Sequence, residues 1–249
     1  AKNGYSYISK DNWNVHYTAA DGTKITCRGN YNRGEMPNAL TQDKWESAVN
    51  GAISFSDSLS KVENTNISLV TFSGSASIAT EFSHTALTAR DFGHPEGNTN
   101  LQAGLSNAID KLKEITDPNA QKYIVVIGDG QPTSGGSNGK SATDRAMDRA
   151  YEAKNDNKIT VFSIGYGIEN DATAKDVLKK ISSDTTMTRV YGYRDYYEYN
   201  KEEKGFYKEA NSTGIADSFK TIFEDIKTSI AATNGVLTDV IGDNFKYVE

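Results

Sequence analysis

A carboxylate follows directly on a strongly apolar segment of this chain. Residues 123–128 read Tyr-Ile-Val-Val-Ile-Gly, a continuous run typical of a strand covered on both faces, and Asp129 comes next. Burying a carboxylate there is unfavourable unless it meets a cation or hydrogen-bond donors, although Asp-Gly is also a common turn. Thr99 lies just where a helix should begin, and taken alone it is a helix cap. Whether the two side chains form one site depends on the elements that carry them.

Two patterns near residues 134–141 resemble catalytic motifs but lack the context those motifs need. Residues 135–139 match Gly-x-Ser-x-Gly, yet a hydrolase of that class needs a histidine after its serine, and every histidine here precedes it. The same stretch nearly forms a phosphate-binding loop, but Ser134 replaces its first glycine and the preceding strand ends too early. We therefore expect a flexible Gly-Ser loop and no enzyme activity. The histidines, which show no metal-ligand spacing, are His16, His84 and His94.

From Thr41 onward, helix and strand patterns alternate regularly. The expected helices are 41–61, 101–112, 142–154, 174–182 and 215–230, and the expected strands are 66–73, 123–128 and 159–165. This order predicts right-handed βαβ units, and hence an α/β fold with a doubly wound, mostly parallel sheet flanked by helices. Ligands of such sheets bind beyond the carboxyl ends of the strands. The loops after Ser73, Gly128 and Gly165 are therefore where we expect the site.

Two polar segments interrupt this alternation. Residues 1–40 contain two short alternating runs around Ala-Asp-Gly, which predict a β-hairpin arm. Residues 189–212 are rich in tyrosine and charge, and predict a second surface insertion. Aromatic rings give a large contact area at low entropic cost, so these tyrosines form either a ligand-binding rim or a loop with half-buried rings. The candidate rim residues are Tyr191, Tyr193, Tyr196 and Tyr197.

Composition limits the partners. The net charge of −6 and the pI near 5.2 leave no basic footprint for nucleic acid or anionic lipid. No apolar run approaches the length of a membrane span. Cys27 is the single cysteine of the 249 residues, so neither an intrachain disulfide nor a zinc knuckle can form.

In this order, the segments resemble the von Willebrand factor type A (vWA) family. The resemblance runs from residue 41 to 232, and its motifs are Gly-x-Thr-Asn-Leu at 97–101 followed by an apolar strand that ends in Asp-Gly at 129–130. It implies a metal-ion-dependent adhesion site at the carboxyl edge of the sheet, with Mg²⁺ as the expected ion and Mn²⁺ or Ca²⁺ as alternatives. In that family, Thr99 and Asp129 would supply the threonine and aspartate ligands, and an acidic residue of the partner would complete the coordination.

The chain lacks two features that the family has before its first helix. No Asp-x-Ser-x-Ser occurs in the 249 residues, and no apolar strand precedes the helix at Thr41, so the metal site is incomplete in this chain. Losing a central strand would expose the apolar faces of its neighbours. We expect that strand to come from an upstream segment or from another polypeptide. In a permuted alternative, residues 236–243 occupy the gap.

The family resemblance also suggests a role for the domain. Residues 1–232 read as a vWA domain without its first strand, and residues 233–249 as the start of an adjoining β-rich stalk domain. This arrangement is similar to that of Gram-positive pilus-tip and cell-wall-anchored adhesins. It implies an extracellular module at the bacterial cell surface or cell wall, binding a matrix or host-cell surface protein. The alternatives are an intracellular vWA scaffold for protein assembly, a structural spacer with a degenerate metal site, and a nucleotide hydrolase that uses the Gly-Ser loop.

Overall fold

The computed structural model describes the body of the chain and several short strands. The described residues are 6–10, 14–18, 24–28, 39–93, 98–192, 195–211, 213–233, 238–239 and 243–244, and side chains are described from residue 45 to 230 within these ranges. The helices are α1 (Ala39–Leu59), η1 (Ala89–Phe92, a 3₁₀ turn), α2 (Leu101–Lys113), α3 (Ala142–Tyr151), η2 (Glu152–Asp156, a π turn), α4 (Ala172–Ile181) and α5 (Ile215–Thr233). The strands are β1 (Ser6–Lys10), β2 (Asn14–Thr18), β3 (Lys24–Arg28), β4 (Asn66–Phe72), β5 (Ala76–Ile78), β6 (Tyr123–Gly128), β7 (Thr160–Tyr166), β8 (Thr185–Val190), β9 (Tyr196–Lys201), β10 (Tyr207–Ala210), β11 (Thr238–Asp239) and β12 (Asp243–Asn244).

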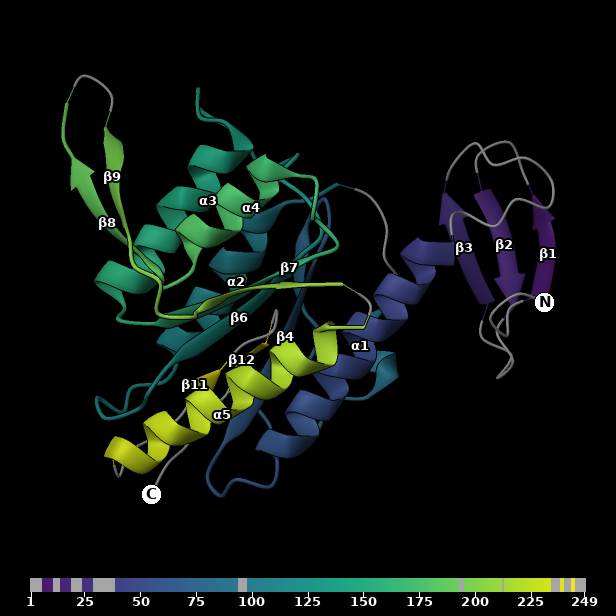
Figure 1. Cartoon of the computed structure of the whole chain (residues 1–249), viewed down its shortest axis with the longest axis horizontal. Coiled ribbons are helices and arrows are strands. Elements are labelled where there is room, and N and C mark those ends of the chain that lie inside the picture. The colour runs from purple at the N-terminus through teal and green to yellow at the C-terminus, as the bar shows by residue number, and fades with distance from the viewer. Residues whose placement is uncertain are drawn as a thin grey trace.

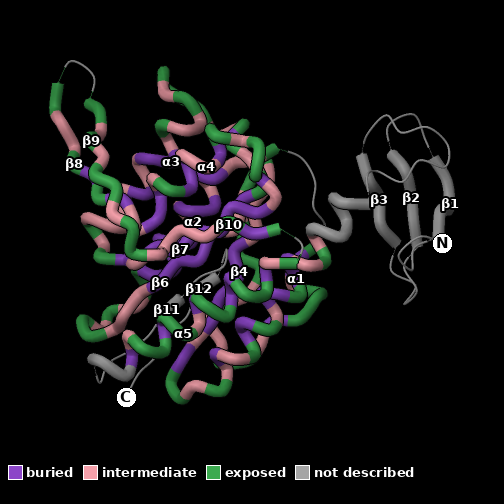
Figure 2. The backbone as a smooth tube through the Cα atoms, in the orientation of Figure 1, coloured by how far each residue is buried: buried purple, intermediate pink, exposed green. Residues whose placement is uncertain are grey.

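The central sheet confirms the predicted fold class. Strands β10, β7 and β6 are parallel neighbours in that order, with Gly128 opposite Gly165. β4 carries β5 as an antiparallel edge strand. Helices α1 and α5 cover one face of the sheet, and α2, α3 and α4 cover the other (Figure 1). β6 and β7 are thus buried on both sides, which is why they are mostly apolar rather than alternating (Figure 2).

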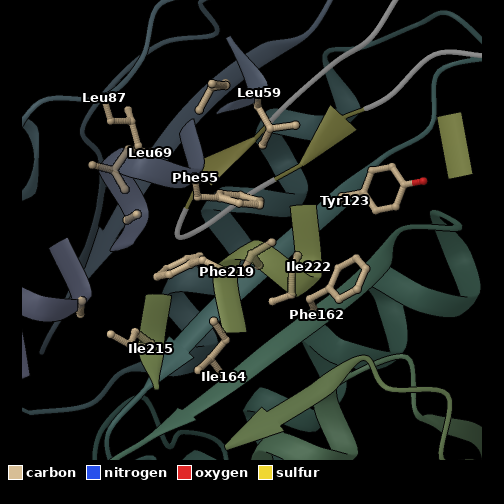
Figure 3. Close-up of a cluster of buried hydrophobic side chains, with 14 of the residues drawn as sticks. Phe55, Leu59, Leu69, Leu87, Tyr123, Phe162, Ile164, Ile215, Phe219 and Ile222 are labelled. Carbon is tan, nitrogen blue, oxygen red and sulfur yellow. The ribbon is translucent and has the colours of Figure 1, made fainter. Parts of the chain in front are cut away.

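Aromatic rings fill the core beneath α1 and α5. Phe55 of α1 meets Phe219 of α5 with 5.5 Å between ring centroids, and Tyr123 stacks on Phe162 across β6 and β7 at 6.2 Å (Figure 3). Gly51 allows the two helices to approach, because a Cβ atom at this position would lie 2.6 Å from the Phe219 ring. The missing side chain therefore sets the spacing of α1 and α5, and with it their position on the sheet.

The predicted N-terminal arm forms a small sheet of its own. β2 pairs antiparallel with β3, as the alternating runs predict, and β1 adds a third strand on the other side of β2. This sheet lies beyond the first turn of α1, apart from the parallel sheet (Figure 1). The turn between β2 and β3 lies outside the described residues.

The tyrosine-rich segment divides into two parts. β8 and β9 form an antiparallel hairpin that projects from the body (Figure 1), whereas β10 returns to the main sheet as an edge strand beside β7. The hairpin begins at Thr185 and ends at Lys201, so both of its ends lie before those of the predicted insertion, 189–212.

Two short strands of the C-terminal segment lie beside β4. β11 pairs parallel to β4 and β12 pairs antiparallel to it, over two residues each. Cα atoms of both strands come within 8 Å of β6, and no ladder between described residues joins β4 directly to β6. Pieces of the C-terminal segment thus occupy the gap that the permuted alternative assigns to them. The division of the chain at residue 233 stays a prediction, as does the origin of a full central strand.

Candidate metal-site loops at the carboxyl edge of the sheet

Asp129 leaves the carboxyl end of β6 and faces solvent. It follows Gly128, which packs closely under Leu178 of α4, so the strand ends tightly held just before the carboxylate. Among the described residues, the Asp129 carboxylate has no hydrogen-bond or ion-pair partner. The carboxylate is therefore held at the sheet edge by its backbone alone and can accept a ligand.

Thr99 lies on the neighbouring loop, and it is not the helix cap that the sequence indicates for it in isolation. The N-cap of α2 is Asn100, whose side chain accepts a hydrogen bond from the Ala103 amide at 3.1 Å. The Thr99 hydroxyl has no hydrogen-bond partner in the described part of the chain. As with Asp129, its oxygen is therefore available to an external group.

Backbone bonds join the Thr99 loop to the loop that follows Asp129. The Thr99 amide donates to the Thr133 hydroxyl at 2.9 Å, and the Thr99 carbonyl accepts from the Thr133 amide at 2.9 Å and the Ser134 amide at 3.2 Å. The two sequence-predicted ligands thus lie on loops that contact each other. Thr133 gives no sequence signal for this role, because every residue except proline supplies a backbone amide and serine or threonine at any surface position supplies a hydroxyl.

A third loop, after β4, meets the other two. The Asn100 amide donates to the Ser73 carbonyl at 2.6 Å, and the Asn100 side chain donates to the Gly74 carbonyl at 3.0 Å. The loops after Ser73 and Gly128 therefore converge, as the strand order predicts. The loop after Gly165 leads instead into α4, which is capped by Asp171.

The chemistry of these side chains suits a small hard cation. Such ions take hydroxyl, carboxylate and water oxygens, and Thr99 and Asp129 offer a hydroxyl and a carboxylate with no internal partner. Within the described residues no group of three or more His, Cys, Asp or Glu side chains could hold a metal ion. The remaining ligands of an ion here would have to come from water, from a partner or from a strand that carries further oxygen ligands.

The four predicted rim tyrosines differ in exposure. Tyr191 and Tyr196 are exposed, at 76% and 54% of their full area. Tyr197 points the other way, since it donates from its hydroxyl to Asp148 at 2.9 Å and its ring lies 5.2 Å from that of Tyr151. Tyr193 lies outside the described residues. The hairpin therefore exposes two of these rings and uses a third as an anchor.

Burial of Tyr197 and Tyr199 raises the pKa values of their hydroxyls. Burial, together with the bond to Asp148, raises the pKa of Tyr197 well above its ordinary value. Burial also raises the pKa of Tyr199 to about 12, and the Lys180 ammonium lies 4.7 Å from that ring. Tyr197 therefore holds the hairpin through its ring and its hydroxyl, and Tyr199 through its ring.

Lys154 fastens the base of the hairpin. Its ammonium donates to the carbonyls of Lys180, Ser182 and Thr185 at 2.7–2.8 Å, and so joins η2 to the end of α4 and the start of β8. Burial lowers the pKa of Lys154 to about 7. Asp184 closes the base from the other side, accepting from the amides of Lys204 at 2.7 Å and Tyr207 at 2.6 Å. The sequence does not indicate either contact, because the groups that meet are far apart along the chain.

The Gly-Ser loop has the structure of a helix entry. Ser141 caps α3, accepting from the Asp144 amide at 3.1 Å while its own amide donates to the Asp144 carboxylate. His84 lies elsewhere, with its Nδ1 atom 2.7 Å from the Thr65 carbonyl.

The parallel sheet with helices on both faces defines a doubly wound α/β domain, a class in which ligands bind at the carboxyl edge of the sheet. Residues 37–203 match the model of the von Willebrand factor type A domain, and the chain belongs to this family. None of the helices in the part of the chain that the structure describes is long and apolar enough to span a membrane.

Solved structures with this fold include pilus components. The chain is similar to the vWF domain of the type V pili tip protein Mfa5 from Porphyromonas gingivalis, with a TM-score of 0.59 at 14% identity over 78% of this chain and 91% of that one. A structure of three N-terminal domains of Mfa5 gives a TM-score of 0.53 at 14% identity, covering 74% of this chain and 46% of that one. At this level of identity, the likeness establishes the fold alone.

A curated relative is an animal protein. The chain is 28% identical over 158 residues to inter-alpha-trypsin inhibitor heavy chain H2 from Homo sapiens, a match that covers 61% of this chain and 14% of that protein. The chain therefore spans a small part of the relative's length, and the match bears on the vWA domain only.

Proposed function

We propose that this vWA domain is an extracellular adhesion module that binds a protein ligand through a divalent cation at the carboxyl edge of its sheet. Mg²⁺ is the ion we expect there, with Mn²⁺ or Ca²⁺ as alternatives. Thr99 and Asp129 supply two of its ligands, and an acidic side chain of the partner takes an open position. The ion would act as a bridge between carboxylates that otherwise repel each other, and no covalent chemistry is involved.

The observation that carries this proposal is that two side chains without a partner among the described residues, Thr99 and Asp129, lie on loops that are hydrogen-bonded to each other. A helix cap or a turn would leave the Thr99 hydroxyl or the Asp129 carboxylate engaged with nearby amides, and neither is engaged within the described residues. The hydrogen bonds from Thr133 and Ser134 to Thr99 fix the two loops before any ligand arrives. Preorganised oxygen ligands of this kind bind hard cations with little reorganisation.

Besides water and the partner, a strand between β4 and β6 is the third source of the remaining ligands. In the described residues β11 and β12 pair with β4 over two residues each, and β6 forms no ladder on its side away from β7. Side chains of β4 and β6 enter the hydrophobic cores on both faces of the sheet, so a strand between them would be apolar on both faces. We propose that an upstream segment or another polypeptide supplies this strand and, at its carboxyl end, further oxygen ligands.

The exposed tyrosines of the hairpin form a second candidate contact surface. Tyr191 and Tyr196 lie on the far part of β8–β9, beyond the rings that pack on α3. We propose that they contribute to the ligand-binding rim, whereas Tyr197 supports them. We also propose that β-rich stalk domains adjoin this domain in the same protein, and that the protein is located at the bacterial cell surface.

The test uses the full-length protein that carries this chain, on a panel of immobilised matrix proteins with Mg²⁺ or with EDTA. We expect EDTA to abolish binding and Asp129→Asn to weaken it at least about tenfold, since a charged ligand is lost. Asp156→Asn is the matched control, because Asp156 is an exposed acid that precedes β7 at the opposite edge of the sheet. Binding that is indifferent to EDTA would overturn the metal mechanism. Absence of divalent-ion binding in calorimetry would favour a structural spacer.

A further inference from the structure

Asn100 touches every loop of the candidate site. Its backbone amide donates to Ser73 and its side-chain Nδ2 donates to Gly74, both in the loop after β4. Its Oδ1 caps α2 at Ala103. On the remaining side lies Gly135, where a Cβ atom would be only 2.2 Å from Asn100 Oδ1. We call these contacts of Asn100 with Ser73, Gly74, Ala103 and Gly135 the Asn100 clasp.

The clasp does more than an ordinary helix cap requires. A cap needs one acceptor for an amide of the first turn, and Oδ1 alone provides it. The Nδ2 bond to Gly74 adds nothing to α2, but it ties the helix start to the end of β4. Gly135 has a φ of +95°, a conformation that favours glycine, and this brings its backbone against the Asn100 amide group.

Thr99 is held from both sides as a result. Its successor Asn100 is bonded to the loop after β4, and its own carbonyl is bonded to Thr133 and Ser134 in the loop after β6. Segment 99–100 is therefore the connection between these loops. Moving Asn100 would move the Thr99 hydroxyl relative to Asp129, because residues 133–135 follow Asp129 closely in the chain.

We propose that Asn100 is a positioning residue that holds the Thr99 loop between the loops after β4 and β6, and so fixes the separation of the Thr99 hydroxyl and the Asp129 carboxylate. The consequence for metal binding rests on the proposed function. The positioning itself is a property of the polypeptide without a metal, and it can be measured separately. Asn100 contacts no ion in this role.

Asn100→Asp separates the clasp from the cap. Aspartate caps a helix about as well as asparagine, so the bond to Ala103 remains, whereas the donor to Gly74 is lost. In metal-free protein, we expect amide hydrogen exchange at Thr133 and Ser134 to accelerate about threefold to tenfold, which corresponds to the loss of one such bond. Exchange within α2 should stay unchanged. Asp171→Ala, which removes the matching cap of α4, should destabilise that helix without affecting Thr133 or Ser134.

Gly135→Ala tests the contact between Gly135 and Asn100 by changing Gly135 instead of Asn100. Its methyl group would collide with Asn100, so we expect it to accelerate exchange at Ser134 and at the Asn100 amide by a similar factor. Because Asn100→Ala removes the atoms that collide, the double variant Asn100→Ala/Gly135→Ala should change exchange by less than the product of the single effects. A residue that only caps a helix would not show this coupling.

The experiments distinguish a failure of the Asn100 clasp from a failure of the proposed function. Unchanged exchange at Thr133 and Ser134 in Asn100→Asp, or independent effects of the two substitutions in the double variant, would overturn the clasp. Mn²⁺ titration of the full-length protein then tests the link to the site, where we expect affinity to fall about tenfold in Gly135→Ala, which adds no charge, and to stay constant in Asp171→Ala. If the wild-type protein binds no Mn²⁺, the proposed function fails, and the exchange data still decide whether the clasp exists.

Discussion

Neighbouring tyrosines on β9 give opposite predictions, because successive residues of a strand face opposite sides. Tyr197 faces α3, where it meets Tyr151 and Asp148, and Tyr196 faces solvent beside Val190. We consider the substitutions Tyr197→Ala and Tyr196→Ala. Both remove the same ring from the same strand, so each is the control for the other.

The contacts of Tyr197 set the size of the effect. An aromatic pair contributes roughly 0.5–1.5 kcal/mol, and a hydrogen bond to a charged group roughly 1.5–3 kcal/mol. Since Tyr197 is only partly buried, we take the lower parts of both ranges and expect Tyr197→Ala to lower the free energy of unfolding by about 2 kcal/mol. Tyr196→Ala should change it by less than about 0.5 kcal/mol, as for other exposed sites.

Urea denaturation measures stability, and hydrogen exchange at the amides of β8 and β9 measures the hairpin locally. Tyr197→Ala should lower the urea midpoint and open the hairpin, whereas Tyr196→Ala should do neither and should instead weaken ligand binding. Equal loss of stability in the two variants would refute the assignment of anchor and exposed ring. Unchanged ligand binding in Tyr196→Ala would remove that ring from the proposed rim.

Three further predictions concern the packing and the hairpin base. Gly51→Ala should destabilise the domain by about 1 kcal/mol in thermal unfolding, because the roughly 1–3 kcal/mol cost of overpacking against Phe219 exceeds the roughly 1 kcal/mol gain in helix propensity; a stabilised variant would contradict this. The folded-state pKa of Lys154 is lowered to about 7 from 10.5, so between these values the unfolded chain binds more protons and stability should rise with pH across that window. Lys154→Met should remove this rise in urea titrations at pH 7 and 10, and parallel profiles of the two proteins would argue against it. Asp184→Ala should free the segment 201–204 and speed its cleavage by trypsin, while Asp156→Ala should leave the cleavage rate unchanged.

The order of elements and the meeting of two of the candidate loops were predictable from local patterns. Continuous apolar runs such as 123–128 arise only when both faces of a strand are covered, and the helices between them repeat apolar residues at helical spacing. Once the strands are parallel, their carboxyl ends must share an edge, which places the loops after Ser73 and Gly128 together. The family resemblance then selected Thr99 and Asp129 from those loops.

Roles that depend on contacts between distant residues were not predictable in this way. Asn100 and Thr99 are adjacent polar residues at a helix start, and only the loops that fold against them decide which is the cap and which keeps a free hydroxyl. In the same way, Lys154 bonds to carbonyls that lie 26–31 residues away. A backbone carbonyl has no side-chain signature, so no residue pattern marks its partner.

The tyrosine-rich segment, residues 189–212, shows most directly what the sequence could not predict. Composition established that residues 189–212 carry many rings, but burial depends on which face of β9 meets α3, and that is fixed by the register of β8 against β9. The sequence by itself predicted the βαβ order and the edge of the sheet at which we propose the site, and the family resemblance selected the two side chains proposed as ligands. The tertiary structure alone decided which polar groups are engaged and which are free, because hydrogen bonds and burial between distant segments exist only after the chain has packed.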